Sequence, residues 1–173
     1  MRHHAVWPKR LPHAINPPAT PLWENLAISA KRYPDKEALV FFGCTMNYRQ
    51  LLQQTERLAA YLQSLGVQKG DRVVLNMQNC PQLVIAHFAI LRANAVVVPV
   101  NPMNRSEELR HYVRDTGAQV AVVAQDLYPE LASVRHEGQG LSQLIVAAYS
   151  DYLKHPTDLP LRPVVRSEEH TSE

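Results

Sequence analysis

The feature that most constrains this chain is a regular alternation of short apolar, β-branched runs with longer amphipathic segments. The runs 72–77, 96–98, 119–123 and 144–146 are predicted to be strands, and the segments between them have helical periodicity. Strands joined through helices pair in parallel by right-handed crossovers. The sequence therefore predicts an α/β fold with a mostly parallel, doubly wound sheet that helices cover on both faces.

One helix has both of its ends marked in the sequence. Asn47 and Gln50 form an Asn-x-x-Gln variant of the capping box, which predicts that a helix begins at Tyr48. Apolar residues then recur every three or four positions along one face, and Gly66 occupies the place of a left-handed C-terminal cap. This is the best-defined element of the sequence.

A second capping box is predicted further along the chain. Asn104-x-x-Glu107 marks the start of a helix, and Gly117 marks its end. Three side chains of this helix are expected to face inward, namely Leu109, Tyr112 and Val113.

Other helices are predicted at 22–33, at 80–93 and after Leu127, where Asn79 and Pro81 open the second of these. The helix at 80–93 has hardly any polar face, so it should be buried between layers. A strand at 38–42 is expected to turn back at Gly43-Cys44 and form a small hairpin.

Composition excludes several classes of protein. The formal charge of +2 and the dispersed Lys and Arg residues do not make a basic stripe for nucleic acid. Cys44 and Cys80 are far apart and have no metal-ligand spacing, so neither a disulfide nor a zinc site is expected. No run is long enough to cross a membrane and the N-terminus lacks a signal peptide, so a cytoplasmic location is expected.

The two ends of the chain differ from its middle. Residues 1–21 hold five of the thirteen prolines and are expected to form an extended leader. Residues 22–165 are expected to be part of one large N-terminal domain. The polar segment 166–173 resembles the in-frame translation of a sequencing adapter, so the natural sequence is expected to continue differently after Val165; a solvated acidic tail is the alternative.

Common catalytic motifs are missing from the sequence. It contains no GxSxG nucleophile elbow, no GxxxxGK[ST] phosphate loop and no HExxH. Gly138-Gln139-Gly140 lacks the preceding strand and third glycine of a dinucleotide site, so a plain turn is expected there. No catalytic residue and no metal ligand is therefore assigned.

Five strings, in order, resemble the adenylate-forming (AMP-binding) family, which includes acyl-CoA synthetases, firefly luciferase and the adenylation domains of peptide synthetases. The resemblance covers about residues 20–150. Two departures are mild: Gln50 stands where the family usually has Glu, and Asn94 where it usually has Gly, although Asn tolerates a left-handed turn. The strings are 33–39 (YPDKEAL), 46–51 (MNYRQL), 65–73 (LGVQKGDRV), 79–82 (NCPQ) and 91–102 (LRANAVVVPVNP).

The resemblance implies the N-terminal fragment of an AMP-forming acyl-CoA synthetase. Such an enzyme uses ATP and Mg²⁺ to convert a carboxylate into an acyl-adenylate, and then transfers the acyl group to CoA. In the family, the phosphate loop, the magnesium-orienting Glu, the ribose-binding Asp and the mobile-domain lysine all lie downstream of this segment. The chain alone is therefore expected to be inactive.

One loop is a candidate for ligand contact. Asn101, Pro102 and Arg105 lie between a predicted strand and a capped helix, where backbone N–H groups, the helix dipole and the Arg105 side chain can face one anion. The loop resembles one that touches the nucleotide phosphates of CoA in acyl-CoA synthetases. The alternative is that Arg105 is a solvated residue at the start of the helix.

The substrate class has several interpretations. The string at 97–102 resembles medium- or long-chain fatty acid ligases most, while an aryl-acid CoA ligase or another adenylate-forming enzyme stays open. A truncated, non-catalytic α/β binding module is a further alternative. A nicotinamide-dependent oxidoreductase is disfavoured because no GxGxxG follows a strand. Nothing in the sequence indicates the oligomeric state.

Overall fold

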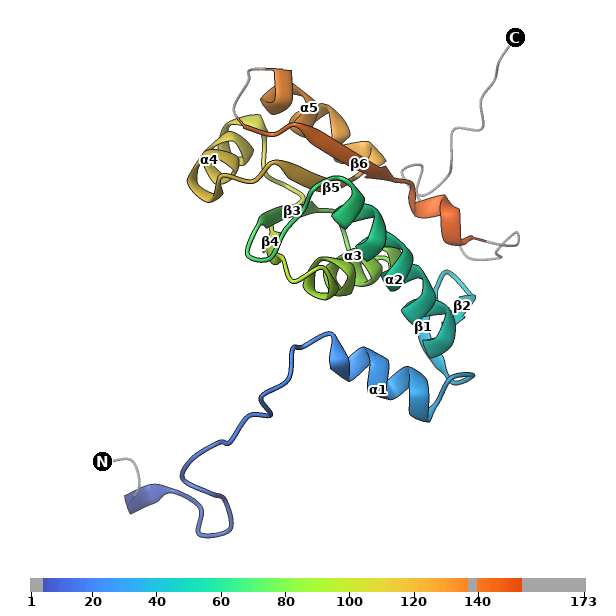
Figure 1. Ribbon diagram of the computed structural model, residues 1–173, viewed down its shortest axis with the longest axis vertical. Coiled ribbons are helices and arrows are strands. Elements are labelled where there is room, and N and C mark those ends of the chain that lie inside the picture. The colour runs from blue at the N-terminus through green and yellow to red at the C-terminus, as the bar shows by residue number, and fades with distance from the viewer. Residues whose placement is uncertain (1–4, 137–139, 154–173) are drawn as a thin grey trace.

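The computed structural model describes residues 5–136 and 140–153 (Figure 1). Helices and strands alternate as the sequence predicts. In chain order the elements are α1 (Glu24–Arg32), β1 (Glu37–Phe41), β2 (Cys44–Asn47), α2 (Tyr48–Ser64), β3 (Arg72–Asn76), α3 (Pro81–Arg92), β4 (Val96–Pro99), α4 (Ser106–Thr116), β5 (Val120–Ala124), the 3-10 turn η2 (Gln125–Leu127), α5 (Tyr128–His136), β6 (Gln143–Ala147) and the 3-10 turn η3 (Tyr149–Tyr152).

Four of the strands form one parallel sheet in the order β4-β3-β5-β6. In its register, Val73 of β3 lies between Val97 of β4 and Val120 of β5. The chain moves outward from β3 to β4 and then returns past β3 to β5. Figure 1 shows α2 and α3 on one side of this sheet and α4 and α5 on the other. The predicted doubly wound architecture is confirmed.

Alternation along the strands produces a separate core on each face of the sheet. Val73 and Leu75 of β3 pack in one cluster with Leu62 of α2 and Ile90 of α3. Val74 packs in the opposite cluster with side chains of α4 and α5. The helix at 80–93 that was expected to be buried has no exposed residue in α3.

A third cluster attaches the N-terminal elements to the rest of the molecule. It joins α1 and the β1–β2 hairpin to α2 and α3. The guanidinium of Arg92 also lies 4.4 Å from the ring centroid of Trp23, which is a cation–π contact between the ends of α3 and α1. The buried members of the cluster are Leu26, Met46, Leu51 and Ile85.

Both ends of α2 confirm the sequence signals. The Asn47 side chain accepts a hydrogen bond from Gln50 N at 2.9 Å, and the Gln50 side chain accepts one from Asn47 N at 3.0 Å. At the other end Gly66 has a φ of +90°. Val67 N then donates to Leu62 O at 3.1 Å, which completes a Schellman motif.

The hairpin turn lies one residue earlier than expected. Phe42 and Gly43 form the two-residue loop, with φ values of +46° and +81°, and Cys44 already pairs with Phe41. Two consecutive residues with positive φ match the type I′ turn, whose twist suits the flanking strands. The predicted turn at Gly43-Cys44 is therefore wrong by one position.

Helix α3 also begins one residue later than predicted. Its N-cap is Cys80, whose sulfur accepts a hydrogen bond from Leu83 N at 3.4 Å, and Pro81 is the first helical residue. Asn79 lies outside the helix. At the end of this unit Asn94 has a φ of +59°, so the expected left-handed turn is present.

Helix α4, like α3, begins one residue later than its predicted capping box implies. Arg105, rather than Asn104, is the N-cap, and its backbone N–H donates to Glu108 Oε2 at 2.8 Å. Asn104 belongs to the preceding turn, because its N–H donates to Asn101 O. Tyr112, which was expected to face inward, is exposed on the outer side of the helix.

Several sequence predictions fall outside the described residues. The adapter-like segment 166–173, most of the glycine turn at 138–140 and the first four residues of the leader are among them. Residues 5–21 are exposed and precede α1 (Figure 1). Among the described helices, none combines the length and the apolar character needed to cross a membrane.

Candidate functional site: the carboxyl edge of the sheet

The strand order reverses between β3 and β5, and this reversal determines where a ligand is expected. Helix α3 leaves β3 toward one face, whereas α4 and α5 cover the other face. In open α/β sheets the crevice at such a reversal, beyond the carboxyl ends of the strands, is the usual ligand site. The loops after β3, β4 and β5 meet at this edge, and the predicted 101–105 loop is one of them.

The 101–105 loop is held by local hydrogen bonds. Asn101 Oδ1 accepts from Met103 N at 2.9 Å, and the Asn101 carbonyl accepts from Asn104 N at 2.9 Å. Pro102 is half-buried, while the Arg105 side chain is 80% exposed. The loop therefore has a fixed backbone and presents one long cationic side chain to solvent.

A carboxylate already occupies the N-terminal end of α4. Glu130, in the first turn of α5, accepts hydrogen bonds from Ser106 N at 2.9 Å and from the Ser106 hydroxyl. Its other oxygen accepts from Arg105 Nη1 at 3.0 Å. These hydrogen bonds, those from Ser106 first and that from Arg105 next, hold the pKa of Glu130 below its ordinary value.

Glu130 was missed by reasoning from the sequence. The expectation was that backbone N–H groups at this helix end, together with Arg105, would be available to an outside anion. In the structure the N–H of Ser106 donates to Glu130 and the N–H of Arg105 donates to Glu108. The only sequence signal for Glu130 is its place in the first turn of the following helix, where acidic residues are common for reasons of the dipole alone.

Buried side chains lie behind the same edge. Gln78 N, just after β3, donates to the Tyr149 hydroxyl at 3.2 Å. Burial raises the pKa of Tyr149 to about 12, and the nearby Asp126 carboxylate adds to the rise. Burial also raises the pKa of the Cys80 thiol. Both groups are therefore protonated at neutral pH, which disfavours a nucleophilic role for either of them.

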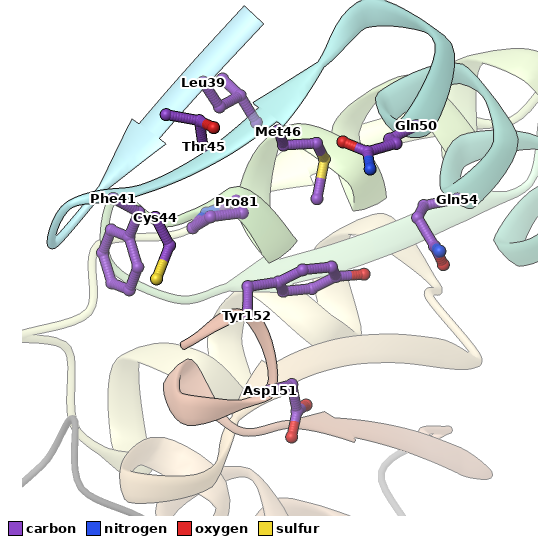
Figure 2. A pocket seen from close by; sticks show the side chains of 10 residues that line it. All are labelled: Leu39, Phe41, Cys44, Thr45, Met46, Gln50, Gln54, Pro81, Asp151 and Tyr152. Carbon is purple, nitrogen blue, oxygen red and sulfur yellow. The ribbon is translucent and has the colours of Figure 1, made fainter. Parts of the chain in front are cut away.

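A cavity of about 370 Å³ lies between the β1–β2 hairpin, α2, the start of α3 and η3 (Figure 2). Figure 2 shows the Tyr152 ring beneath Met46 and Pro81, with its hydroxyl end toward Gln54. Burial, and next the Asp151 carboxylate, raise the pKa of Tyr152. The lining combines apolar side chains with the polar groups of Gln50, Gln54 and Asp151, and none of the residues predicted to bind a ligand is among them.

The described residues offer no evident metal centre. In the ranges 5–136 and 140–153, no three His, Cys, Asp or Glu side chains are grouped to hold an ion. What the edge does offer is an exposed guanidinium on a rigid loop, which is suited to recognising an anion.

Comparison with known proteins gives the family. The family model described as "AMP-binding enzyme" matches residues 26–169. A long-chain-fatty-acid–CoA ligase of Bacillus subtilis is 34% identical over 155 residues, which are 90% of this chain and 28% of that protein. A ligase of the same name from Escherichia coli O6:H1 is 40% identical over 130 residues, 74% of this chain and 23% of that protein.

Solved structures agree with the sequence comparisons. A long-chain-fatty-acid-CoA ligase from Archaeoglobus fulgidus superposes with a TM-score of 0.69 at 28% identity, covering 78% of this chain and 28% of that one. A fatty acyl CoA synthetase from Mycobacterium tuberculosis gives a TM-score of 0.69 at 26% identity, covering 77% and 27%. The chain thus spans about a quarter of the length of the relatives it matches. By the extent of these matches, the chain belongs to the AMP-binding enzyme family.

Proposed function

We propose that this chain is the N-terminal part of a medium- or long-chain fatty acid–CoA ligase. The observation that supports this most is the identity of 34–40% to several proteins named long-chain-fatty-acid–CoA ligase. The whole enzyme would join a fatty acid to ATP, giving an acyl-adenylate and pyrophosphate. The CoA thiol would then attack the acyl carbon and displace AMP, so that ATP, Mg²⁺ and CoA are all required. Its location would be cytoplasmic.

Residues 22–165 would contribute scaffold to that enzyme rather than reacting groups. They provide a rigid parallel sheet, and its carboxyl edge holds the 101–105 loop in place. Neither a phosphate loop nor a catalytic lysine motif is found in the 173 residues. We therefore propose that this chain alone does not form adenylates.

Arg105 is proposed to contact the nucleotide phosphates of CoA, with Asn101 and Pro102 shaping the loop behind it. Support comes from the exposure of its side chain and from the hydrogen bonds that fix the loop. Only one guanidinium N–H group has a described acceptor, Glu130, so the others can bind a phosphate. An Arg105→Ala enzyme should have a raised KM for CoA with nearly unchanged adenylate formation.

The experiment is to complete the gene from genomic DNA and to assay the full-length protein. CoA thioester formation would be measured with palmitate, octanoate and benzoate in the presence of ATP and Mg²⁺. We expect kcat/KM for one of the fatty acids to exceed that for benzoate by at least about tenfold, because an alkyl pocket rejects a short rigid ring. Preference for benzoate would favour the aryl-acid alternative, and no thioester with any acid would refute the proposal.

The inactivity of the 173-residue chain has its own test. Labelled pyrophosphate should not exchange into ATP when this chain is incubated with palmitate, whereas the full-length enzyme should catalyse the exchange. Exchange by the short chain at a comparable rate would show that it contains an active site. If the completed gene instead ends directly after Glu173, the non-catalytic binding module becomes the better interpretation.

A further inference from the structure

The contact between Arg105 and Glu130 joins the N-terminal ends of two helices that are separate in the sequence. Arg105 and Ser106 begin α4 after β4, whereas Glu130 lies in the first turn of α5 after β5. The strands β4 and β5 are not neighbours, because β3 lies between them. The carboxylate therefore ties two βα units together at the edge of the sheet where a ligand is expected.

The Glu130 carboxylate is itself held in place. One oxygen accepts from both the backbone N–H and the hydroxyl of Ser106, which are rigid parts of the α4 N-terminus. The side chain is 28% exposed, compared with 80% for Arg105. The Glu130 side chain is therefore the fixed partner, and it orients the more exposed side chain of Arg105.

An exposed arginine loses much conformational freedom when it binds an anion, and a partner that orients it beforehand reduces this loss. The Glu130 carboxylate accepts a hydrogen bond from Nη1 of Arg105 and leaves the rest of the guanidinium exposed to solvent. An anion on the outer side of the fork would be separated from the carboxylate by the positively charged guanidinium itself. The sign of the change in the KM for CoA in Glu130→Gln decides whether orientation or repulsion is the larger effect.

We infer that Glu130 is a positioning residue for CoA binding: fixed by Ser106, it orients Arg105 toward the nucleotide phosphates. The inference rests on the proposed function, since it requires that Arg105 contact CoA. It adds a residue on α5 that touches neither substrate and acts only through Arg105.

The test uses the full-length enzyme and the KM for CoA. Glu130→Gln keeps an oxygen that can accept from Ser106 but weakens the charge pair with Arg105, and we expect a rise in KM of about three- to tenfold, the effect of one side chain losing its orientation. Glu107→Gln is the matched control, because it removes the same charge from the exposed first turn of α4, the helix whose N-cap is Arg105. It should leave the KM unchanged.

A double-mutant cycle separates positioning from a structural role. In an Arg105→Ala background, Glu130→Gln should cause no further change in the KM for CoA. Fatty acid-dependent pyrophosphate exchange, which does not need CoA, shows that each sample is folded.

Four outcomes would overturn the inference. A lower KM in Glu130→Gln would mean that the carboxylate competes with CoA. An equal rise in Glu107→Gln would mean that only net charge matters. An effect that persists without Arg105 would assign Glu130 to the structure of α4. An unchanged KM for CoA in Arg105→Ala would show that Arg105 does not contact CoA. A separate result, failure of the wild-type enzyme to form any thioester, would refute the proposed function.

Discussion

Replacing Asn47 by alanine tests whether the start of α2 is stabilised as the structure shows. The Asn47 side chain accepts from Gln50 N at 2.9 Å, and alanine would leave that N–H without its acceptor. The reciprocal bond from Asn47 N to the Gln50 side chain uses the backbone and can survive. The change therefore removes one of the two hydrogen bonds of the capping box.

The expected loss is about 1–1.5 kcal/mol, the range for an N-cap whose helix also packs in the core. Leu51, in the first turn of α2, is only 3% exposed, so fraying of this turn would also loosen the cluster with Leu26. Urea unfolding followed by circular dichroism at the helix band measures the loss. With a slope of about 2 kcal/mol per molar urea, the midpoint should fall by roughly 0.5–0.8 M.

Asn104 offers a matched control within the same chain. It has the same sequence signature as Asn47, but Arg105 is the N-cap of α4. Asn104→Ala should therefore shift stability by less than about 0.5 kcal/mol. Asn47→Asp should retain most of the wild-type stability, because aspartate also caps helices. If Asn104→Ala costs as much as Asn47→Ala, or if Asn47→Asp is as unstable as the alanine variant, the reasoning is refuted.

Three further predictions concern the stability of the chain, each measured by the same unfolding assay. Gly66→Ala should cost about 1–2 kcal/mol because a Cβ is strained at φ +90°, even though no atom beyond the two flanking residues lies within 4 Å of it; no loss would contradict the Schellman motif. Asn76→Leu should stabilise the fold by about 1–3 kcal/mol, since both amide atoms of this 1% exposed side chain are buried without a hydrogen-bond partner in the described structure; destabilisation would show that the amide has a partner. Tyr149 has its pKa raised to about 12, so its contribution is fully present below pH 10 and is lost as pH rises from 10 toward 12. The rise to about 12 corresponds to at most about 3 kcal/mol, and burial of the hydroxyl is its main cause; Tyr149→Phe should remove this part of the alkaline decline, and an unchanged pH profile would contradict it.

Element order and sheet type could be predicted because they depend on periodicity, which each segment carries by itself. The run 119–123 is apolar throughout, and in the structure all of β5 is buried, as expected of a strand covered on both faces. The capping box of α2 was equally local, since Asn47 and Gln50 lie three residues apart. Such local patterns predict the structure correctly because no contact from a distant part of the chain replaces the local one.

The predicted start of a helix was wrong where two neighbouring residues could each serve as its N-cap. Asn104-x-x-Glu107 has the residue types of a full capping box, whereas at Arg105-x-x-Glu108 only the Glu108 half can form, because an arginine side chain has no hydrogen-bond acceptor. The structure uses the second because the Asn101 carbonyl binds the N–H of Asn104 and the Glu130 carboxylate binds the N–H of Ser106. The second of these contacts depends on α5, which no local pattern could reveal.

The candidate site was predictable only in part for the same reason. The loop with Asn101, Pro102 and Arg105 could be located at a strand–helix junction. Its electrostatic state could not, because Glu130 reaches it only after β5 has paired on the far side of β3. Whether the loop meets CoA stays a prediction that the KM measurements decide.

The central position of β3 in the sheet has a consequence for synthesis on the ribosome. Its two partner strands are both made later, and each follows an intervening helix, whereas the β1–β2 hairpin can close around two residues as soon as it emerges. With roughly 50 residues still to be added after β3 before β5 is complete, and about 5–20 residues added per second, this apolar strand waits roughly 2–10 s for its second partner. During that interval one edge of the apolar run from Val73 to Leu75 has no partner strand, and its unpaired backbone groups are open to pairing with other chains.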